Sequence, residues 1–395
     1  MEQKTNQNYM YGVDMIRFIA AVLVGLFHLT WLIKSTSLVA WYGWVGVQVF
    51  FVISGLVIAQ SAQHATPRKF AWSRFMRLYP AAWICAVINL SALIYLYGAS
   101  ASLPKMFIRS LALFPVGPFL ASAYWTLPIE LTFYGLILVL LLFKSFQYIE
   151  RVAVVLCVMS ATYIIAFSLH VAGIVHLPIL EFNYADWKSL SLLRHGVYFA
   201  CGIFLWLWSE GRLSRLGRVA CLVGFMTGPL EITCRSAEMV ALLPVRTSLS
   251  VVWPIPVLIW YVACGLIGAA ICRRREIIRY IPARILNVVR MAGLATYPLY
   301  LLHELVGKAI RDLLVGYGVS YLLSALSALS VAAFVAFGVA RFGEPLLRSI
   351  IIGLFTAMGL RRGDRLGAIT KTTSCQKGGS ATASNSRPNE VDAMG

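Results

Sequence analysis

The stretch YGVDMIRFIAAVLVGLFHLTW, residues 11–31, decides how the rest of the chain is interpreted. From residue 15 onward it is apolar except for Arg17, His28 and Thr30. Together with the next two residues it has about the length that a membrane-spanning helix needs. Ionisable groups in such a helix are costly and are by default functional. The stretch therefore predicts a transmembrane helix that carries chemistry.

The spacing of the charged residues in this helix is informative. Arg17 and His28 are eleven residues apart, so their side chains project from nearly the same face, about 16 Å apart along the axis. Asp14 lies one turn before Arg17 and is predicted to pair with it. One helix thus holds an anion-binding group near one end and a titratable imidazole beyond the middle of the membrane.

The composition extends this interpretation to the whole chain. Of 395 residues, 59% are hydrophobic and 13% are charged, and the mean hydropathy is +0.77. Soluble domains have about twice this charged fraction, and the strands of a β-barrel would not give such unbroken apolar runs. The predicted fold class is all-α, a polytopic transmembrane helical bundle. The net charge of +18 is explained by topology rather than by nucleic acid, because Lys and Arg lie mostly between the apolar runs.

About ten spans are predicted from the apolar runs. They cover residues 13–33, 44–63, 79–98, 124–143, 151–170, 194–209, 216–232, 249–271, 292–314 and 319–340. With the N-terminus inside, fifteen Lys and Arg fall in inner loops and eight in outer loops, as the positive-inside rule requires. Deleting the weak seventh span would place the six arginines of residues 273–290 outside.

The chain is accordingly divided into four parts. Residues 1–12 are a cytoplasmic segment, residues 13–345 the membrane domain, residues 346–360 an interfacial helix and residues 361–395 a disordered cytoplasmic tail. The eight cysteines are interpreted as small buried hydrophobes, and no metal site is expected.

Two motifs follow the first helix. In GVQVFFVISG, residues 46–55, the glycines and Ser54 let helices approach closely, which is as compatible with packing as with function. In RKFAWSRFMRLYP, residues 68–80, Arg74 and Arg77 lie one turn apart. They either anchor the inner leaflet or bind phosphates, for which arginine is suited.

Two further spans carry ionisable groups. Glu130, with Tyr134 one turn on, enters the membrane in WTLPIELTFY, residues 125–134. A buried carboxylate must be paired, protonated or catalytically active. His303 ends YPLYLLH, residues 297–303, at a depth similar to that of His28. A lone histidine here either satisfies a backbone group or takes part in chemistry.

These motifs, in this order from residue 12 to about 345, resemble the acyltransferase 3 family of integral-membrane O-acyltransferases. The resemblance implies an acyl-CoA donor, usually acetyl-CoA, and an acceptor hydroxyl on a polysaccharide or a related extracytoplasmic molecule. By position it assigns Arg17 and His28 to the family's arginine–histidine pair and Glu130 to its glutamate. Likewise, it assigns His303 to the ninth-span histidine and Arg74 with Arg77 to the arginine-rich start of the third span.

Two departures from the family pattern are mild. Gln48 stands where an acidic residue is frequent, and Thr126 where serine is common. An acidic role at position 48 is therefore in doubt for this chain.

The predicted chemistry follows from what acyl transfer needs: a base, oxyanion stabilisation and a hold on the donor phosphates. His28 is assigned as general base or as transient acyl carrier. The expected catalytic set is His28, Glu130 and His303, in which Glu130 and His303 position the acceptor or orient His28. Donor binding is assigned to the three arginines at positions 17, 74 and 77. Asp14, Ser54 and Tyr134 are expected to support them.

Two rival functions fit the same residues. A proton-coupled transporter would use His28, Glu130 and His303 as a relay, and a scaffold would present the acceptor to a separate enzyme. The five ordered motifs favour the enzyme. Its expected partners are acyl-CoA, a glycan or glycolipid acceptor, membrane lipids and polysaccharide-assembly proteins, in a bacterial inner membrane with both termini cytoplasmic.

Overall fold

The computed structural model describes residues 9–30, 40–176, 180, 190–242 and 248–358. Within these ranges the chain is helical and contains no strand. A helix satisfies its own backbone hydrogen bonds, which is the condition for crossing lipid. The predicted all-α class is confirmed.

Ten helical segments correspond to the ten predicted spans. Eight are long and apolar enough to cross a membrane: Tyr11–Thr30 (α1), Trp41–Ala62 (η1 and α3), Pro67–Tyr97 (α4), Ser122–Leu142 (η2 and α6), Phe146–Val171 (η3 and α7), Pro254–Cys272 (α11), Ala283–Leu302 (α13) and Tyr321–Ala357 (α15, η6 and α16). The other two are α8 (Gly196–Ser209), which is short, and α9 (Arg215–Ala241), which carries several charges. About ten spans therefore agree with the structure.

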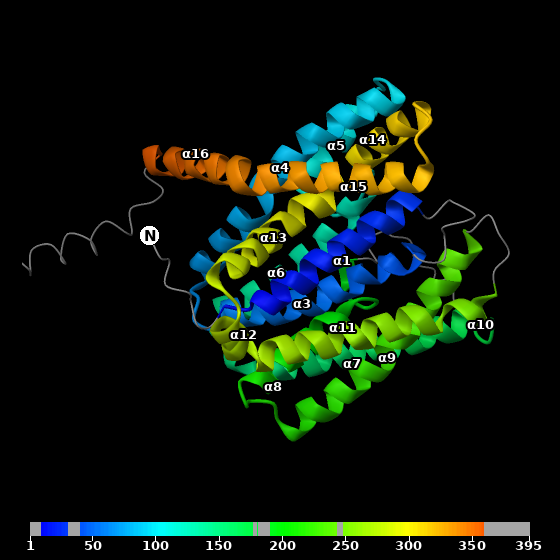
Figure 1. Ribbon diagram of the computed structural model, residues 1–395. Coiled ribbons are helices and arrows are strands. Elements are labelled where there is room, and N and C mark those ends of the chain that lie inside the picture. Colours follow the sequence, from blue (N-terminus) through cyan, green and yellow to red (C-terminus); the bar gives the residue numbers. More distant parts are fainter. Residues whose placement is uncertain (1–8, 31–39, 177–179, 181–189, 243–247, 359–395) are drawn as a thin grey trace, which may run out of the picture. The chain divides into compact units, whose positions relative to one another are not determined.

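Glycines bring neighbouring helices into close backbone contact, as between α1 and α3, which lie side by side in Figure 1. A Cβ on Gly55 of α3 would lie 2.1 Å from the carbonyl oxygen of Phe199 in α8, and one on Gly202 of α8 would lie 2.0 Å from that of Val52. A Cβ on Gly43, just before α3, would likewise lie 2.0 Å from the carbonyl oxygen of Leu23 in α1. These small residues therefore serve packing.

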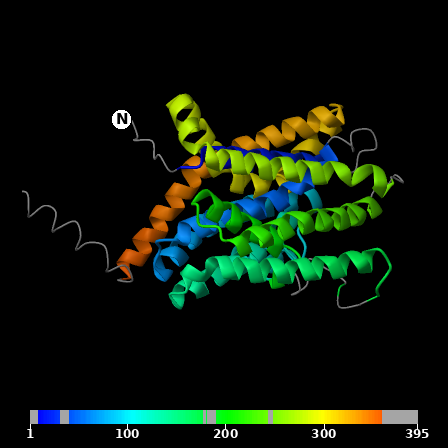
Figure 2. The ribbon, with the colours of Figure 1, turned by 90° about the horizontal axis from the view of Figure 1, so that it is seen from below.

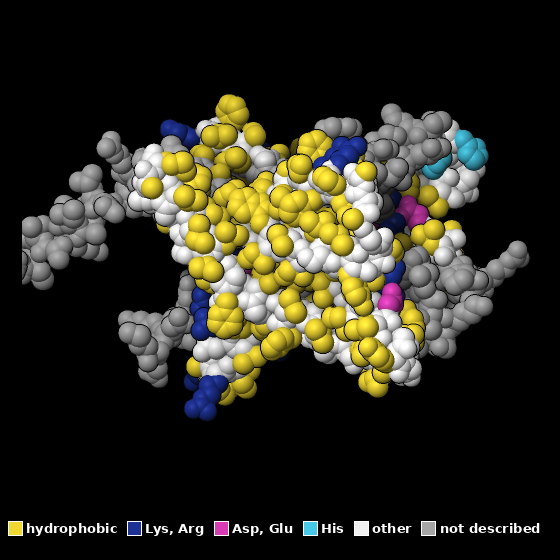
Figure 3. Space-filling view, turned by 90° about the horizontal axis from the view of Figure 1, so that it is seen from above, with side chains coloured by type: hydrophobic (Ala, Val, Ile, Leu, Met, Phe, Trp, Pro, Cys, Tyr) yellow, Lys and Arg dark blue, Asp and Glu magenta, His cyan; other side chains and the backbone are white. Residues whose placement is uncertain are grey.

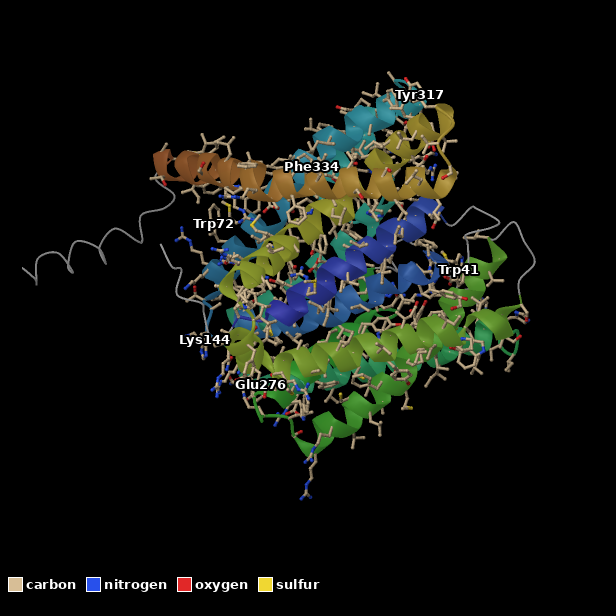
Figure 4. The ribbon with its side chains drawn as sticks, in the orientation of Figure 1. Trp41, Trp72, Lys144, Glu276, Tyr317 and Phe334 are labelled. Carbon is tan, nitrogen blue, oxygen red and sulfur yellow. The ribbon has the colours of Figure 1, made fainter. Side chains whose placement is uncertain are left out.

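The helices alternate in direction, so their connections gather at two ends. We call the arginine-rich end the one at which residues 62–67, 142–149, 209–215 and 272–283 turn. Lys144 and Glu276 lie at this end, whereas Trp41 and Tyr317 lie at the opposite end (Figure 4). Of the eight cations predicted outside, Lys34, Lys188 and Arg246 fall outside the described residues.

The lateral surface is apolar, as a lipid-facing surface must be. Figure 3 shows one face covered largely by hydrophobic side chains, and Figure 2 shows the long α7 running beside α8 and α9. Phe334 of α15 is 80% exposed. Apolar surface of this kind promotes aggregation in water, whereas it is compatible with contact to lipid.

Three predicted boundaries need correction. α4 begins at Pro67, so Arg74 and Arg77 lie inside a helix rather than in the predicted loop. Thr66 caps this helix by accepting from the Lys69 amide at 3.3 Å, and Pro67 fits its first turn. The predicted span 292–314 is two helices, because α13 ends at Leu302 and α14 (Leu305–Gly316) follows a break.

The third correction concerns the predicted outer loop between the third and fourth spans. It contains α5 (Leu103–Ala112), which returns along α4. The Trp83 indole Nε1 donates to the carbonyl oxygen of Leu111 at 3.0 Å, and the Tyr124 hydroxyl donates to that of Ala82 at 3.3 Å. This connection therefore lies against the side of α4 instead of standing clear of the bundle.

The chain forms two compact units, residues 1–345 and 346–395. The second contains most of α16 (Glu344–Ala357). Four short helices complete the description: α10 (Leu249–Val252), α12 (Arg274–Tyr280) and the single turns η1 and η3, at Trp41–Val45 and Phe146–Tyr148. The predicted disordered tail, residues 361–395, lies outside the described residues.

Candidate active site

Two histidines meet in the half of the bundle away from the arginine-rich end. The ring centroids of His28, near the end of α1, and His303, just after α13, are 5.0 Å apart. Gly25 of α1 also faces His303, at an ordinary contact distance of 3.4 Å between a Cβ there and the Cβ of His303, and it leaves room for Leu329 of α15, whose Cδ1 would lie at 2.6 Å. His303 is completely buried, and neither of its ring nitrogens has a hydrogen-bond partner among the described residues. The predicted depth match of the two histidines is therefore a direct contact.

A charged cluster occupies the arginine-rich half of the same helix. Arg17 and Asp14 of α1 face Arg77 of α4, whose charge acts on both. Asp14 fits closely against Gly293 of α13, where a Cβ would lie 2.4 Å from the carboxyl carbon of Asp14. The charged cluster thus consists of Asp14 and Arg17 from α1 and Arg77 from α4.

Asp14 has a different partner from the predicted one. Its Oδ2 accepts a hydrogen bond from the Tyr9 hydroxyl at 2.6 Å, and it forms no ion pair with Arg17 in the described part of the chain. Burial, with the nearby Asp14 charge, raises the pKa of Tyr9 well above its usual value, so the phenol stays protonated and donates. Asp14 therefore anchors the N-terminal approach to α1.

Glu130 of α6 sits in a hydrogen-bonded group of its own. Its Oε1 accepts from the Ser54 hydroxyl at 2.8 Å and from the Tyr134 hydroxyl at 2.5 Å. The Arg74 guanidinium lies 5.9 Å from the centroid of the Tyr134 ring, and the Glu130 charge acts on Arg17. The structure therefore brings Ser54 and Tyr134 to Glu130 as supporting residues and places all three on the arginine side.

A cavity of about 50 Å³ lies beside this group. Its lining consists of Arg17, Val47, Phe50, Phe51, Thr126, Leu127, Glu130, Thr296, Tyr297 and Tyr300. Its volume holds a few water molecules. Neither His28 nor His303 lines the cavity, but the ring centroid of the lining residue Tyr300 is 5.7 Å from that of His303. Tyr300 therefore separates the cavity from the buried histidine pair.

One predicted grouping is not observed. The hydrogen bonds of Glu130 go to Ser54 and Tyr134, so they orient neither His28 nor His303. The predicted catalytic set is thereby divided into a histidine pair and a carboxylate that lines the cavity.

Sequence reasoning missed Tyr297, Tyr300 and Thr126 as cavity residues. The Thr126 hydroxyl lies 3.1 Å from the Tyr300 hydroxyl, which is a buried contact between α6 and α13. A signal was present, because Tyr300 and His303 are three residues apart and therefore share a helix face. The contact between Thr126 of α6 and Tyr300 of α13 could not be predicted in this way, because the two residues are far apart in the sequence.

A second buried ionic group lies at a distance from this site in the sequence. Arg194 pairs with Glu231 at 2.7 Å and with Glu238 at 2.9 Å, and Tyr198 donates to Glu231 at 2.8 Å. These contacts fasten α8 to α9, and each partner neutralises a charge that would otherwise be costly to bury.

Among the described residues no group of His, Cys, Asp and Glu side chains is arranged to hold a metal ion.

Comparison with known proteins gives two matches. A family described as an acyltransferase domain, Acyl_transf_3, matches residues 10–341. A Komagataeibacter xylinus protein named "Putative membrane-bound transacylase BcsY" is 28% identical over 262 residues, which cover 58% of this chain. The match spans 61% of the length of that relative. No solved structure matches the chain significantly.

Proposed function

This chain belongs to the acyltransferase 3 family, and from that membership we propose that it moves an acyl group, acetyl in the simplest case, from acyl-CoA to a hydroxyl of a glycan or glycolipid. The observation that carries this proposal is the closeness of the cavity to the histidine pair. Arg17, Glu130 and Tyr300 line the cavity, and the ring of Tyr300 lies 5.7 Å from that of His303, which contacts His28.

The donor is proposed to bind at the arginine-rich end, which faces the bacterial cytoplasm. Coenzyme A carries a pyrophosphate and a 3′-phosphate, and guanidinium groups bind such anions through paired hydrogen bonds. Arg17 lines the cavity, the Arg77 charge acts on Arg17, and the Arg74 guanidinium lies over the ring of Tyr134, which is bonded to the cavity residue Glu130. Phosphates held there would leave the thioester arm free to enter the bundle.

The chemical step is proposed to occur at the histidine pair. His28 takes the proton from the acceptor hydroxyl as its oxygen attacks the thioester carbonyl carbon. The tetrahedral intermediate then expels the CoA sulfur, the C–O ester bond replaces the C–S bond, and the proton passes from His28 to the departing thiolate. Tyr300, beside His303 and in the cavity wall, is placed to donate a hydrogen bond to the developing oxyanion.

The contacts of Glu130 bear on the rival transporter function. A proton relay needs its members within hydrogen-bonding reach or linked through single waters. Glu130 is hydrogen-bonded to Ser54 and Tyr134 and to neither histidine. A relay of His28, Glu130 and His303 therefore has no direct hydrogen bond between Glu130 and the histidine pair among the described residues.

The test is release of the CoA thiol. Purified protein, acetyl-CoA and methyl β-D-glucopyranoside should release thiol faster than the same mixture without protein, and the glycoside should gain an acetyl ester. Acetyl-CoA that stays intact under these conditions, while a proton gradient drives uptake of the glycoside into vesicles, would support the transporter instead.

A further inference from the structure

A carboxylate that the proposed chemistry does not use stands next to the histidine pair. α13 ends at Leu302, α14 begins at Leu305, and the two residues between them are His303 and Glu304. His303 is fully buried, whereas Glu304 is half-buried. The Glu304 charge acts on the His28 imidazole. The break between the helices therefore places a carboxylate at the edge of the site, on the side away from the arginines.

The two oxygens of Glu304 differ in their contacts. Oε2 accepts from the Ser122 hydroxyl at 2.8 Å and from the Ala123 amide at 3.3 Å. These bonds fix the carboxylate against η2 (Ser122–Trp125). Oε1 has no hydrogen-bond partner among the residues that the structure describes. One oxygen thus orients the group and the other is available to a ligand.

Neighbouring cations on α14 do not neutralise Glu304. Lys308, one turn on, donates to the Tyr97 hydroxyl. Arg311 pairs with Asp312 at 2.7 Å and donates to the carbonyl oxygen of Leu29 at 3.0 Å. Within the described ranges Glu304 therefore forms no ion pair. A half-buried carboxylate of this kind is stabilised best by a ligand that brings hydrogen-bond donors.

We propose that Glu304 binds a second hydroxyl of the acceptor, adjacent to the hydroxyl that reacts. This inference rests on the proposed acyl transfer and defines its substrate class as polyhydroxyl compounds with vicinal hydroxyls. Glu304 directly follows His303, whose ring centroid is 5.0 Å from that of His28, so an acceptor with one hydroxyl at His28 can bring a second hydroxyl to Glu304. The Oε1 atom of Glu304 accepts from one hydroxyl while the other reaches His28.

The test compares two acceptors in the CoA-release assay: methyl β-D-glucopyranoside, which has vicinal hydroxyls, and cyclohexanol, which has one. The wild-type protein should prefer the glycoside. Glu304→Gln should lower that preference about tenfold, by raising the KM for the glycoside, because a hydrogen bond to a charged acceptor is lost. The KM for acetyl-CoA should stay unchanged.

Two control variants separate binding from structure. Asp312→Asn removes an exposed carboxylate eight residues on, and it should leave the preference intact. Ser122→Ala removes one bond that anchors Glu304, but leaves Oε1, and it should keep most of the preference. An unchanged preference in Glu304→Gln, or an equal loss in Ser122→Ala, would overturn the inference. No CoA release by the wild-type protein with either acceptor would instead refute the proposed function.

Discussion

The ring centroids of His28 and His303 are 5.0 Å apart. If it is the general base, His28→Ala should reduce acyl transfer at least about a hundredfold, since a positioned base contributes that much or more. Initial rates of CoA release at equal membrane abundance are the measurement. His303→Ala should also impair transfer.

A histidine outside the site provides the control for this prediction. His64 is exposed near the arginine-rich end of α3, so His64→Ala should keep wild-type rates. Near wild-type transfer by His28→Ala would exclude both the base and the acyl-carrier roles of His28.

The arginines offer a second test at the residue scale. Lysine keeps the charge of Arg17 and Arg74 but loses the planar pair of donors. Arg17→Lys and Arg74→Lys should each raise the acetyl-CoA dissociation constant about tenfold or more, because a charge-assisted contact contributes about 1.5–3 kcal/mol. Calorimetric titration of purified variants at fixed salt measures this effect.

An exposed arginine at the same end serves as the comparison. Arg284 begins α13 and faces away from the protein, so Arg284→Lys should bind acetyl-CoA as the wild type does. Equal affinities in all three variants would make Arg17 and Arg74 topology anchors and leave the donor site unassigned.

Residue spacing predicted part of the site and could not predict the rest. Arg17 and His28 share a face because both lie on one helix, whose period is fixed. Glu130 and Tyr134 likewise lie one turn apart on α6, but the second partner of Glu130, Ser54, belongs to α3, and the partner of Asp14, Tyr9, to the approach to α1. Their contacts depend on how helices are rotated against each other, which is set by packing and not by spacing along one helix.

At the scale of helices, Gly55 tests whether glycine contacts hold the bundle together. Gly55→Ala would place a methyl group 2.1 Å from the carbonyl oxygen of Phe199, so α3 and α8 must separate. Overpacking of this kind costs about 1–3 kcal/mol. The variant should therefore unfold at a lower temperature in detergent, as followed by circular dichroism.

Gly135 of α6 is the matched control, because a Cβ there meets nothing within 4 Å. Gly135→Ala should be neutral or slightly stabilising, since alanine favours a helix. Equal melting temperatures for Gly55→Ala and the wild type would show that the α3–α8 contact is looser than described.

Hydropathy predicted the helices well because a membrane span is defined by length and apolar content. It could not find the break at His303 and Glu304, since no glycine or proline lies between Leu302 and Leu305 to mark it. Nor could it find that α5 returns along α4, which depends on hydrogen bonds such as that of Trp83 to Leu111. Both features arise from contacts between elements.

For the whole molecule, the topology makes a direct prediction. A cytoplasmic reporter fused after Arg365, which lies outside the described residues, should be active. An external reporter should be active at Ser100, an exposed position between α4 and α5. A fusion near Leu111 should be poorly tolerated, because this residue packs against α4. The opposite signal at Ser100 or after Arg365 would mean that the number of spans is wrong, most simply at α9.

The most direct test of the account is transfer across the membrane by this chain alone. Purified protein is reconstituted in liposomes with labelled acetyl-CoA outside and methyl β-D-glucopyranoside trapped inside. In the fraction whose arginine-rich end faces outward, label should appear on the trapped glycoside with the wild-type protein and not with His28→Ala. Label that remains entirely on CoA with the wild-type protein, while the protein binds acetyl-CoA and stays folded, would contradict the proposal that this chain performs the transfer.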